Sequence, residues 1–145
     1  MPVDPVPVGH HTVTPYLMVE DAARQIEFMT RAFGAIERGR FSTPDGRVMH
    51  AEVSIGDSIV MLGEASGETK PMPAMLHLSV PDTDAAYASA IAAGAESLRE
   101  PSNQFYGDRT GGVVDGEGNQ WWISTHVEDV SLAEMERRMR ERATN

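Results

Sequence analysis

One supersecondary pattern occurs twice in this chain. In each copy a short alternating strand ends on a valine, an acidic helix start follows, and the helix closes on the dipeptide Gly-Ala. Val19 and Gly34 mark the first copy, and Val80 and Gly94 mark the second. An offset of about 60 residues at both pairs indicates one unit used twice. Two half-size units need each other to bury a core, so we expect functional side chains in the space between them.

Hydrophobic periodicity predicts the same elements in both halves. In the first half we expect a strand over 13–19, a helix over 22–33 and strands over 35–41, 48–55 and 58–62. In the second half we expect a strand over 75–80, a helix over 83–93 and strands over 96–100, 112–115 and 120–125. A polar linker, residues 65–73, divides repeat one (about 12–64) from repeat two (about 74–127).

The C-terminal segment is predicted to form a separate helix over about residues 131–142. Ser131 and Glu134 have the spacing of a capping box. Leu132, Met135 and Met139 form a narrow apolar stripe, which we expect to dock on the domain or on a second subunit.

Composition excludes several classes of function. The chain has 145 residues, the size of one domain, with 12 Lys and Arg against 22 Asp and Glu. A net charge of −10 argues against a nucleic-acid partner. There is no cysteine, so thiolate nucleophiles and thiolate metal sites are excluded. No apolar run reaches the ~20 residues of a membrane span, and the first residues lack the pattern of a signal peptide, so we expect a cytoplasmic protein.

Two βαβββ units with an acid-capped helix after the first strand of each resemble the vicinal oxygen chelate superfamily. This is the group of glyoxalase I, bleomycin-resistance proteins and extradiol dioxygenases. The resemblance covers about residues 12–127, and the stretches QFYGDR (104–109) and QWWISTHVED (120–129) are similar to its PhnB-like subgroup. It implies one α+β domain over residues 1–145, with the repeats forming a curved mixed sheet around a cavity. It also implies a homodimer.

In the metal-using members of that superfamily, His, Glu or Gln side chains hold a divalent ion in the cavity. Carried over by the repeat register, those positions are Thr14, Met61, Met75 and Trp122. None of these side chains is a normal ligand for a hard divalent ion. We therefore expect the usual metal site to be absent and predict no cofactor.

A displaced divalent metal site is the alternative. His50 and Glu52 share one face of the strand over 48–55, and His77 lies two residues beyond Met75 on the same face of its strand. These three side chains either hold a metal or line the cavity as polar groups. They are also the candidate catalytic residues, because Glu52 near His50 could act as a general base in a buried cavity.

The inward strand faces are expected to form a ligand pocket. Their aromatic and methionine side chains offer flat stacking surface and adaptable shape, and polar side chains share the same faces. The expected lining residues are Thr14, Tyr16, Met61, Met75, His77, Gln120, Trp122 and Ser124. Trp121, on the opposite face, is expected to lie in the core against a helix.

The loop from Tyr106 to Arg109, before Gly111 and Gly112, admits two interpretations. As part of a site, Arg109 pairs with an anionic group of the ligand and Tyr106 gates the entrance. As structure, the glycines turn the chain and Asp108 pairs locally.

These observations favour a glyoxalase- or bleomycin-resistance-like protein that binds a small organic molecule without the usual metal. The alternative is a metal- or Glu/His-dependent lyase, isomerase or dioxygenase of the same superfamily. A third possibility is an interaction subunit in which the C-terminal helix matters most. We expect a small-molecule ligand and a second copy of the chain as partners, and neither nucleic acid nor membrane.

Overall fold

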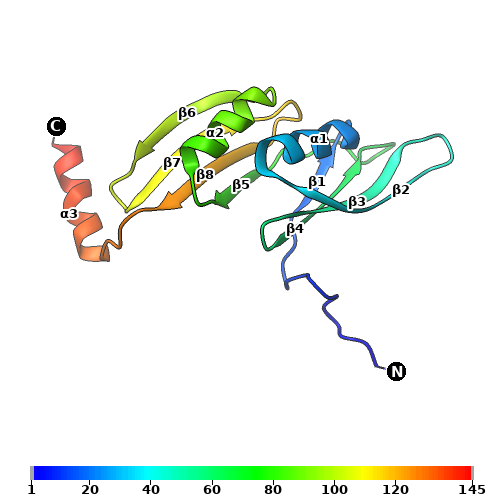
Figure 1. Cartoon of the computed structure of the whole chain (residues 1–145), viewed down its shortest axis with the longest axis horizontal. Coiled ribbons are helices and arrows are strands. Elements are labelled where there is room, and N and C mark those ends of the chain that lie inside the picture. Colours follow the sequence, from blue (N-terminus) through cyan, green and yellow to red (C-terminus); the bar gives the residue numbers. More distant parts are fainter. Residues whose placement is uncertain (1, 145) are drawn as a thin grey trace.

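A computed structural model describes residues 2–144. The elements run in the order β1 (Tyr16–Val19), α1 (Ala22–Phe33), β2 (Ile36–Ser42), β3 (Val48–Ile55), β4 (Ser58–Glu64), β5 (Met75–Ser79), α2 (Thr83–Ala92), β6 (Glu96–Asn103), β7 (Asp108–Val114), β8 (Gln120–His126) and α3 (Leu132–Ala143). The two halves lie side by side, α1 and α2 meet near the middle, and α3 stands at one end (Figure 1). No helix of the described residues is long and apolar enough to cross a membrane.

Each half forms its own four-stranded sheet, which confirms the α+β fold with two βαβββ units. The strand orders are β1-β4-β3-β2 and β5-β8-β7-β6. The first strand of each unit pairs in parallel with the last, and the other pairs are antiparallel. Each sheet is mixed, as the family resemblance implied, and the two halves contribute one sheet each.

The helix caps follow the sequence signals. Asp21 accepts a hydrogen bond from the backbone N–H of Arg24, and Asp82 accepts one from Ala85. Gly34 ends α1 in the left-handed conformation at φ 69°. These caps fix where each helix begins and how the chain returns to its sheet.

The core lies between the helices and the sheets. Leu17 and Leu62 of the first sheet and Trp121 of the second are fully buried. The Trp121 ring lies 5.0 Å from the ring of Phe33 and 6.4 Å from that of Phe28, both on α1, so its predicted core position is confirmed. Because the apolar side chains face the helices, the opposite face of each sheet is left open.

A buried carboxylate joins the halves. Asp115, in the turn before β8, accepts hydrogen bonds at Oδ2 from Trp121 Nε1 at 2.8 Å and from Gln25 Nε2 of α1 at 2.9 Å. Asn119 of the same turn donates to Gln25 Oε1 at 3.0 Å and accepts from the Ala74 backbone N–H at 2.8 Å. All of these side chains are buried, so α1 of the first half is hydrogen-bonded to the β7–β8 turn of the second.

Glu117 of that turn binds the beginning of α1. Its carboxylate accepts hydrogen bonds from the backbone N–H groups of Glu20 and Asp21, both at 3.0 Å, and from Arg24 Nη2 at 2.7 Å. Only 4% of the Glu117 side chain is exposed. The hydrogen bond with Glu117 raises the pKa of Arg24. A carboxylate at a helix N-terminus also interacts favourably with the helix dipole.

The strand boundaries around Gly107 differ from the prediction. β6 runs on to Asn103 and β7 begins at Asp108, so the expected loop is a tight hairpin turn with Gly107 at φ 101°. Gly111 and Gly112 lie inside β7, not in a turn. β1 is shorter than predicted, because it begins only at Tyr16.

The C-terminal helix begins as predicted, since the Ser131 side chain accepts a hydrogen bond from the Glu134 N–H. Arg138 holds the helix by donating to the Phe105 carbonyl oxygen at 2.9 Å. Leu132 and Met139 stay 72% and 57% exposed. The stripe is therefore not buried on its own domain, and docking on a second subunit stays a prediction.

Replacing Asp115 by Ala should lower the free energy of unfolding by about 3 kcal/mol, because the buried indole and amide donors lose their acceptor. Urea unfolding followed by circular dichroism measures the change. Asp57→Ala, in the corresponding but exposed turn of the first half, should change it by less than about 0.5 kcal/mol. Equal effects of the two substitutions would contradict a specific role for the Asp115 network.

Candidate ligand-binding faces

The sheet faces that point away from the helices carry most of the predicted site residues. On the first sheet, Tyr16 of β1 lies beside Met61 of β4, and Met61 lies beside Glu52 of β3. His50 shares this face with Glu52. We call these four residues the first face.

A chain of polar contacts runs across the first face. The Tyr16 hydroxyl lies 3.3 Å from His50 Nδ1, and His50 Nε2 lies 3.1 Å from Glu52 Oε1. The other carboxylate oxygen of Glu52 lies 3.4 Å from His10 Nε2. The Phe41 ring lies 5.8 Å from the His50 ring. Such a row can accept an N–H or O–H group of a ligand, or relay a proton.

Sequence reasoning missed His10. It belongs to the N-terminal arm, and a cavity of about 380 Å³ lies between residues 8–10 of the arm and the first sheet, where Arg38 and Glu52 also line it. The sequence predicts the arm only as an extended segment. No spacing within it signals that His10 returns to Glu52.

On the second sheet, Met75 lies beside Gln120 and His77 beside Trp122. Ser124 is two residues further along β8 on the same face. The Trp122 indole N–H donates to Gln120 Oε1 at 3.1 Å, and the Arg99 guanidinium lies 5.1 Å from the ring centre. We call Met75, His77, Gln120, Trp122 and Ser124 the second face.

Two strand glycines make room for the aromatic side chains of these faces. A Cβ atom on Gly112 would lie 2.6 Å from the Trp122 ring, and one on Gly63 would lie 2.7 Å from the Tyr16 hydroxyl. Sequence reasoning missed both glycines and Arg99. A glycine inside a strand marks a close approach, which is the signal that could have found Gly63 and the true role of Gly112, whose pair with Gly111 was interpreted as a turn.

Both faces are open in the single chain. Met75 is 70% exposed and Tyr16 is 44% exposed. In the single chain the predicted lining residues lie on two open surfaces, because the sheets lie side by side with their helices on one side, and a pocket closed by a second copy stays a prediction. Along β5, a cleft of about 460 Å³ lies between the halves, with Phe33, Leu78 and the predicted site residue His77 among its lining residues.

The three residues of the alternative metal site, His50, Glu52 and His77, are not arranged to hold one divalent ion. His50 and Glu52 are neighbours, but His77 lies on the other sheet. Among residues 2–144 no three His, Asp or Glu side chains form a group that could hold a metal ion. Of the carried-over positions, Met61 lies on the first face and Met75 and Trp122 on the second, while Thr14 precedes β1.

Arg109 is not brought together with the other predicted ligand residues. It lies on the helix side of β7, where Nε and Nη2 donate to the Asp84 carboxylate of α2 at 2.7 and 2.9 Å. This hydrogen bond lowers the pKa of Asp84. Tyr106 sits in the β6–β7 turn with its ring against Phe105, 5.2 Å between centres, and not over either face.

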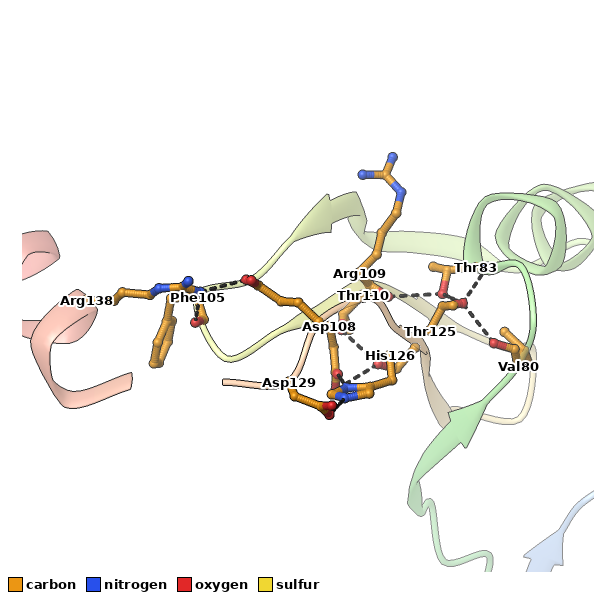
Figure 2. Close-up of polar contacts among 12 residues, drawn as sticks. Val80, Thr83, Phe105, Asp108, Arg109, Thr110, Thr125, His126, Asp129 and Arg138 are labelled. Carbon is orange, nitrogen blue, oxygen red and sulfur yellow. Dashed lines mark hydrogen bonds and ion pairs between the residues drawn. The ribbon is translucent and has the colours of Figure 1, made fainter. Parts of the chain in front are cut away.

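A second polar cluster lies at the far end of the second face. His126 Nδ1 lies 2.8 Å from Asp108 Oδ1, and its Nε2 lies 2.7 Å from Asp129 Oδ1. Ser124 donates to Asp108 Oδ2 at 3.3 Å. Figure 2 shows the Asp108 and His126 side chains together, with Arg109 pointing away from them. The hydrogen bonds with Asp108 and Asp129 raise the pKa of His126.

Comparison with known proteins identifies relatives of this fold. A model of the Glyoxalase/Bleomycin resistance protein/Dioxygenase superfamily matches residues 9–123. The uncharacterized protein Mb0911c of Mycobacterium bovis is 35% identical over 138 residues, which cover 88% of this chain and 91% of that protein.

Solved structures share the architecture. TioX from Micromonospora superposes with a TM-score of 0.69 at 24% identity, over 81% of this chain and 99% of its own. A PhnB protein from Bacillus cereus gives a TM-score of 0.65 at 15% identity, over 79% and 99%. At these identities the structures support the fold alone.

The hydrogen bonds of His126 with Asp108 and Asp129 should stabilise the fold in a pH-dependent way. Because the folded pKa is raised above the ordinary value of 6.5, this stabilisation is fully present below pH 6.5 and is lost as the pH rises through the folded pKa. The difference in unfolding free energy between the wild type and His126→Gln, measured in urea at several pH values, should therefore shrink as the pH rises. A difference that grows with pH would contradict the assignment.

Proposed function

Because the chain belongs to the Glyoxalase/Bleomycin resistance protein/Dioxygenase superfamily, we propose that it binds a small, flat organic molecule without the divalent metal that other members use. The observation that carries this proposal is Trp122, a half-buried indole on an open sheet face. The close approach to Gly112 and the hydrogen bond to Gln120 fix the orientation of its ring. A flat, fixed aromatic surface favours stacking with a planar ligand, which would displace the exposed Arg99 guanidinium from over the ring.

The side chains at the family's metal positions support the same proposal. Methionine and tryptophan replace imidazole and carboxylate there, and these side chains bind apolar and polarisable groups well. The net charge of −10 favours a ligand that is neutral or cationic.

We also propose that two copies pair, so that the open faces are covered in the assembly. The support is the exposed apolar surface of a single chain: Met75 on the second face, Phe41 on β2 and Leu132 on α3 are each more than half exposed. The three side chains come from separate elements, and pairing of two copies would remove their apolar surface from water. Within the superfamily we propose that the chain is related to the PhnB-like members, and the motifs at 104–109 and 120–129 support this.

Trp122→Ala should weaken the binding of flat aromatic cations, such as acridines and phenanthridines, by tenfold or more, because the stacking surface is removed. Fluorescence titration measures the dissociation constant through the ligand signal. Tyr106→Ala is the control, since the Tyr106 ring packs against Phe105 and lies over neither face. EDTA should leave the wild-type affinity unchanged. Absence of binding across a broad library of planar compounds would overturn the proposal.

The first face favours a second candidate function, proton-transfer catalysis by a lyase or isomerase. The observation is the continuous row from Tyr16 through His50 to Glu52, which has the geometry of a general base with an orienting partner.

If this second function holds, Glu52→Gln should reduce turnover by 100-fold or more while planar ligands still bind to Trp122. Turnover is measured with hemithioacetal and other carbonyl substrates, with and without added zinc, nickel or manganese. His77→Ala serves as the comparison on the second face. Undiminished turnover in Glu52→Gln would exclude this carboxylate as the base.

A further inference from the structure

A cavity of about 550 Å³ opens at the ends of the parallel strands β5 and β8. Ser79 and Ser124, which are register partners, line it together with Val80, Pro81, Asp108 and His126. No sequence motif pointed to this cavity, and apart from Ser124 its residues lie outside the two faces defined above. It continues the second face, because Ser124 follows Trp122 by two residues on one strand face.

Hydrogen bonds connect the polar side chains of this cavity. Thr110 Oγ1 lies 3.2 Å from Ser124 Oγ, and both side chains are buried. Ser124 donates to Asp108 Oδ2, and Asp108 Oδ1 bonds His126. A carboxylate oxygen can accept two hydrogen bonds, and the Asp108 side chain is 23% exposed, so acceptor capacity faces the cavity.

The charge of the cavity is negative. Among its lining residues only Asp108 and His126 ionise, and the far side of His126 is bonded to Asp129. Two carboxylates therefore surround one imidazole, which leaves at least one negative charge even when the imidazole is protonated. The nearest arginine in the sequence, Arg109, is paired with Asp84 on the opposite side of β7.

We propose that this cavity is an ammonium-binding subsite for an arylalkylamine ligand, with Asp108 as the anionic acceptor and the Ser79 and Ser124 hydroxyls beside it. This inference rests on the proposed function, which supplies the stacking of the ligand's aromatic ring on Trp122, and it adds a binding site for the amine. Trp122 and Ser124 are separated by about 6–7 Å along the strand. A flat ring on Trp122 joined to an amine by two or three carbon atoms spans this distance and brings the amine to Ser124, whose hydroxyl lies 3.3 Å from Asp108 Oδ2.

The test compares two probes that differ only in charge, 2-(1-naphthyl)ethylamine and 2-(1-naphthyl)ethanol, by isothermal titration calorimetry on the full chain. We expect the amine to bind wild-type protein at least tenfold more tightly than the alcohol. Asp108→Asn should abolish this preference and leave the affinity for the alcohol unchanged. Arg109→Gln, the neighbouring residue on the other side of β7, should change neither affinity.

A second variant separates charge from folding, because Asp108 also supports His126. Ser79 is exposed on an edge strand, so Ser79→Lys places a cation at the cavity with little effect on the fold. This variant should also abolish the preference for the amine. Melting curves of both variants establish that the proteins are folded.

The outcomes distinguish this inference from the proposed function. Equal binding of both probes to the wild type overturns the ammonium subsite and leaves the aromatic face intact. Binding of the amine alone, lost in Asp108→Asn but kept in Trp122→Ala, supports the subsite and overturns stacking. An amine preference that survives Asp108→Asn and Ser79→Lys, or no binding of either probe, overturns the subsite.

Discussion

The buried carboxylate of Asp115 is the interaction on which the arrangement of this molecule depends. It accepts hydrogen bonds from an indole of the second half and from an amide on the first helix. Glu117, two residues on, occupies the N-terminus of that helix. Neither half supplies these partners alone, so the turn aligns the halves as well as joining them. With both helices on one side, both sheets turn their remaining faces to the other.

The two faces that result differ in chemistry although they come from one repeated unit. The first presents a carboxylate between two imidazoles, with phenol and phenyl rings nearby. The second presents an indole with a guanidinium over it and, further along, hydroxyls and a carboxylate. The repeated scaffold thus carries two different sets of side chains. This difference explains why the residues at corresponding positions do not form a symmetric metal site.

The architecture could be predicted from the sequence because it rests on local signals. The repeat, the Asp21 and Asp82 caps, the Gly34 terminus and the core position of Trp121 all follow from residue type and spacing. The site was harder, because it depends on contacts between distant segments. His10 reaches Glu52 from the N-terminal arm, and Arg109 of β7 finds Asp84 on α2. The predicted start of β7 was wrong, because Gly111 and Gly112 were interpreted as a turn. Gly112 lies inside the strand and leaves room for the Trp122 ring.

The contact between Gly112 and the Trp122 ring has a consequence for recognition. A side chain that rests on the backbone of the neighbouring strand has few other rotamers to visit, and its plane is set before any ligand arrives. Association then carries a small entropic penalty at this residue. For the stacking proposed at Trp122, such preorganisation favours rigid partners of matching shape, because a fixed ring does not adjust to flexible ones.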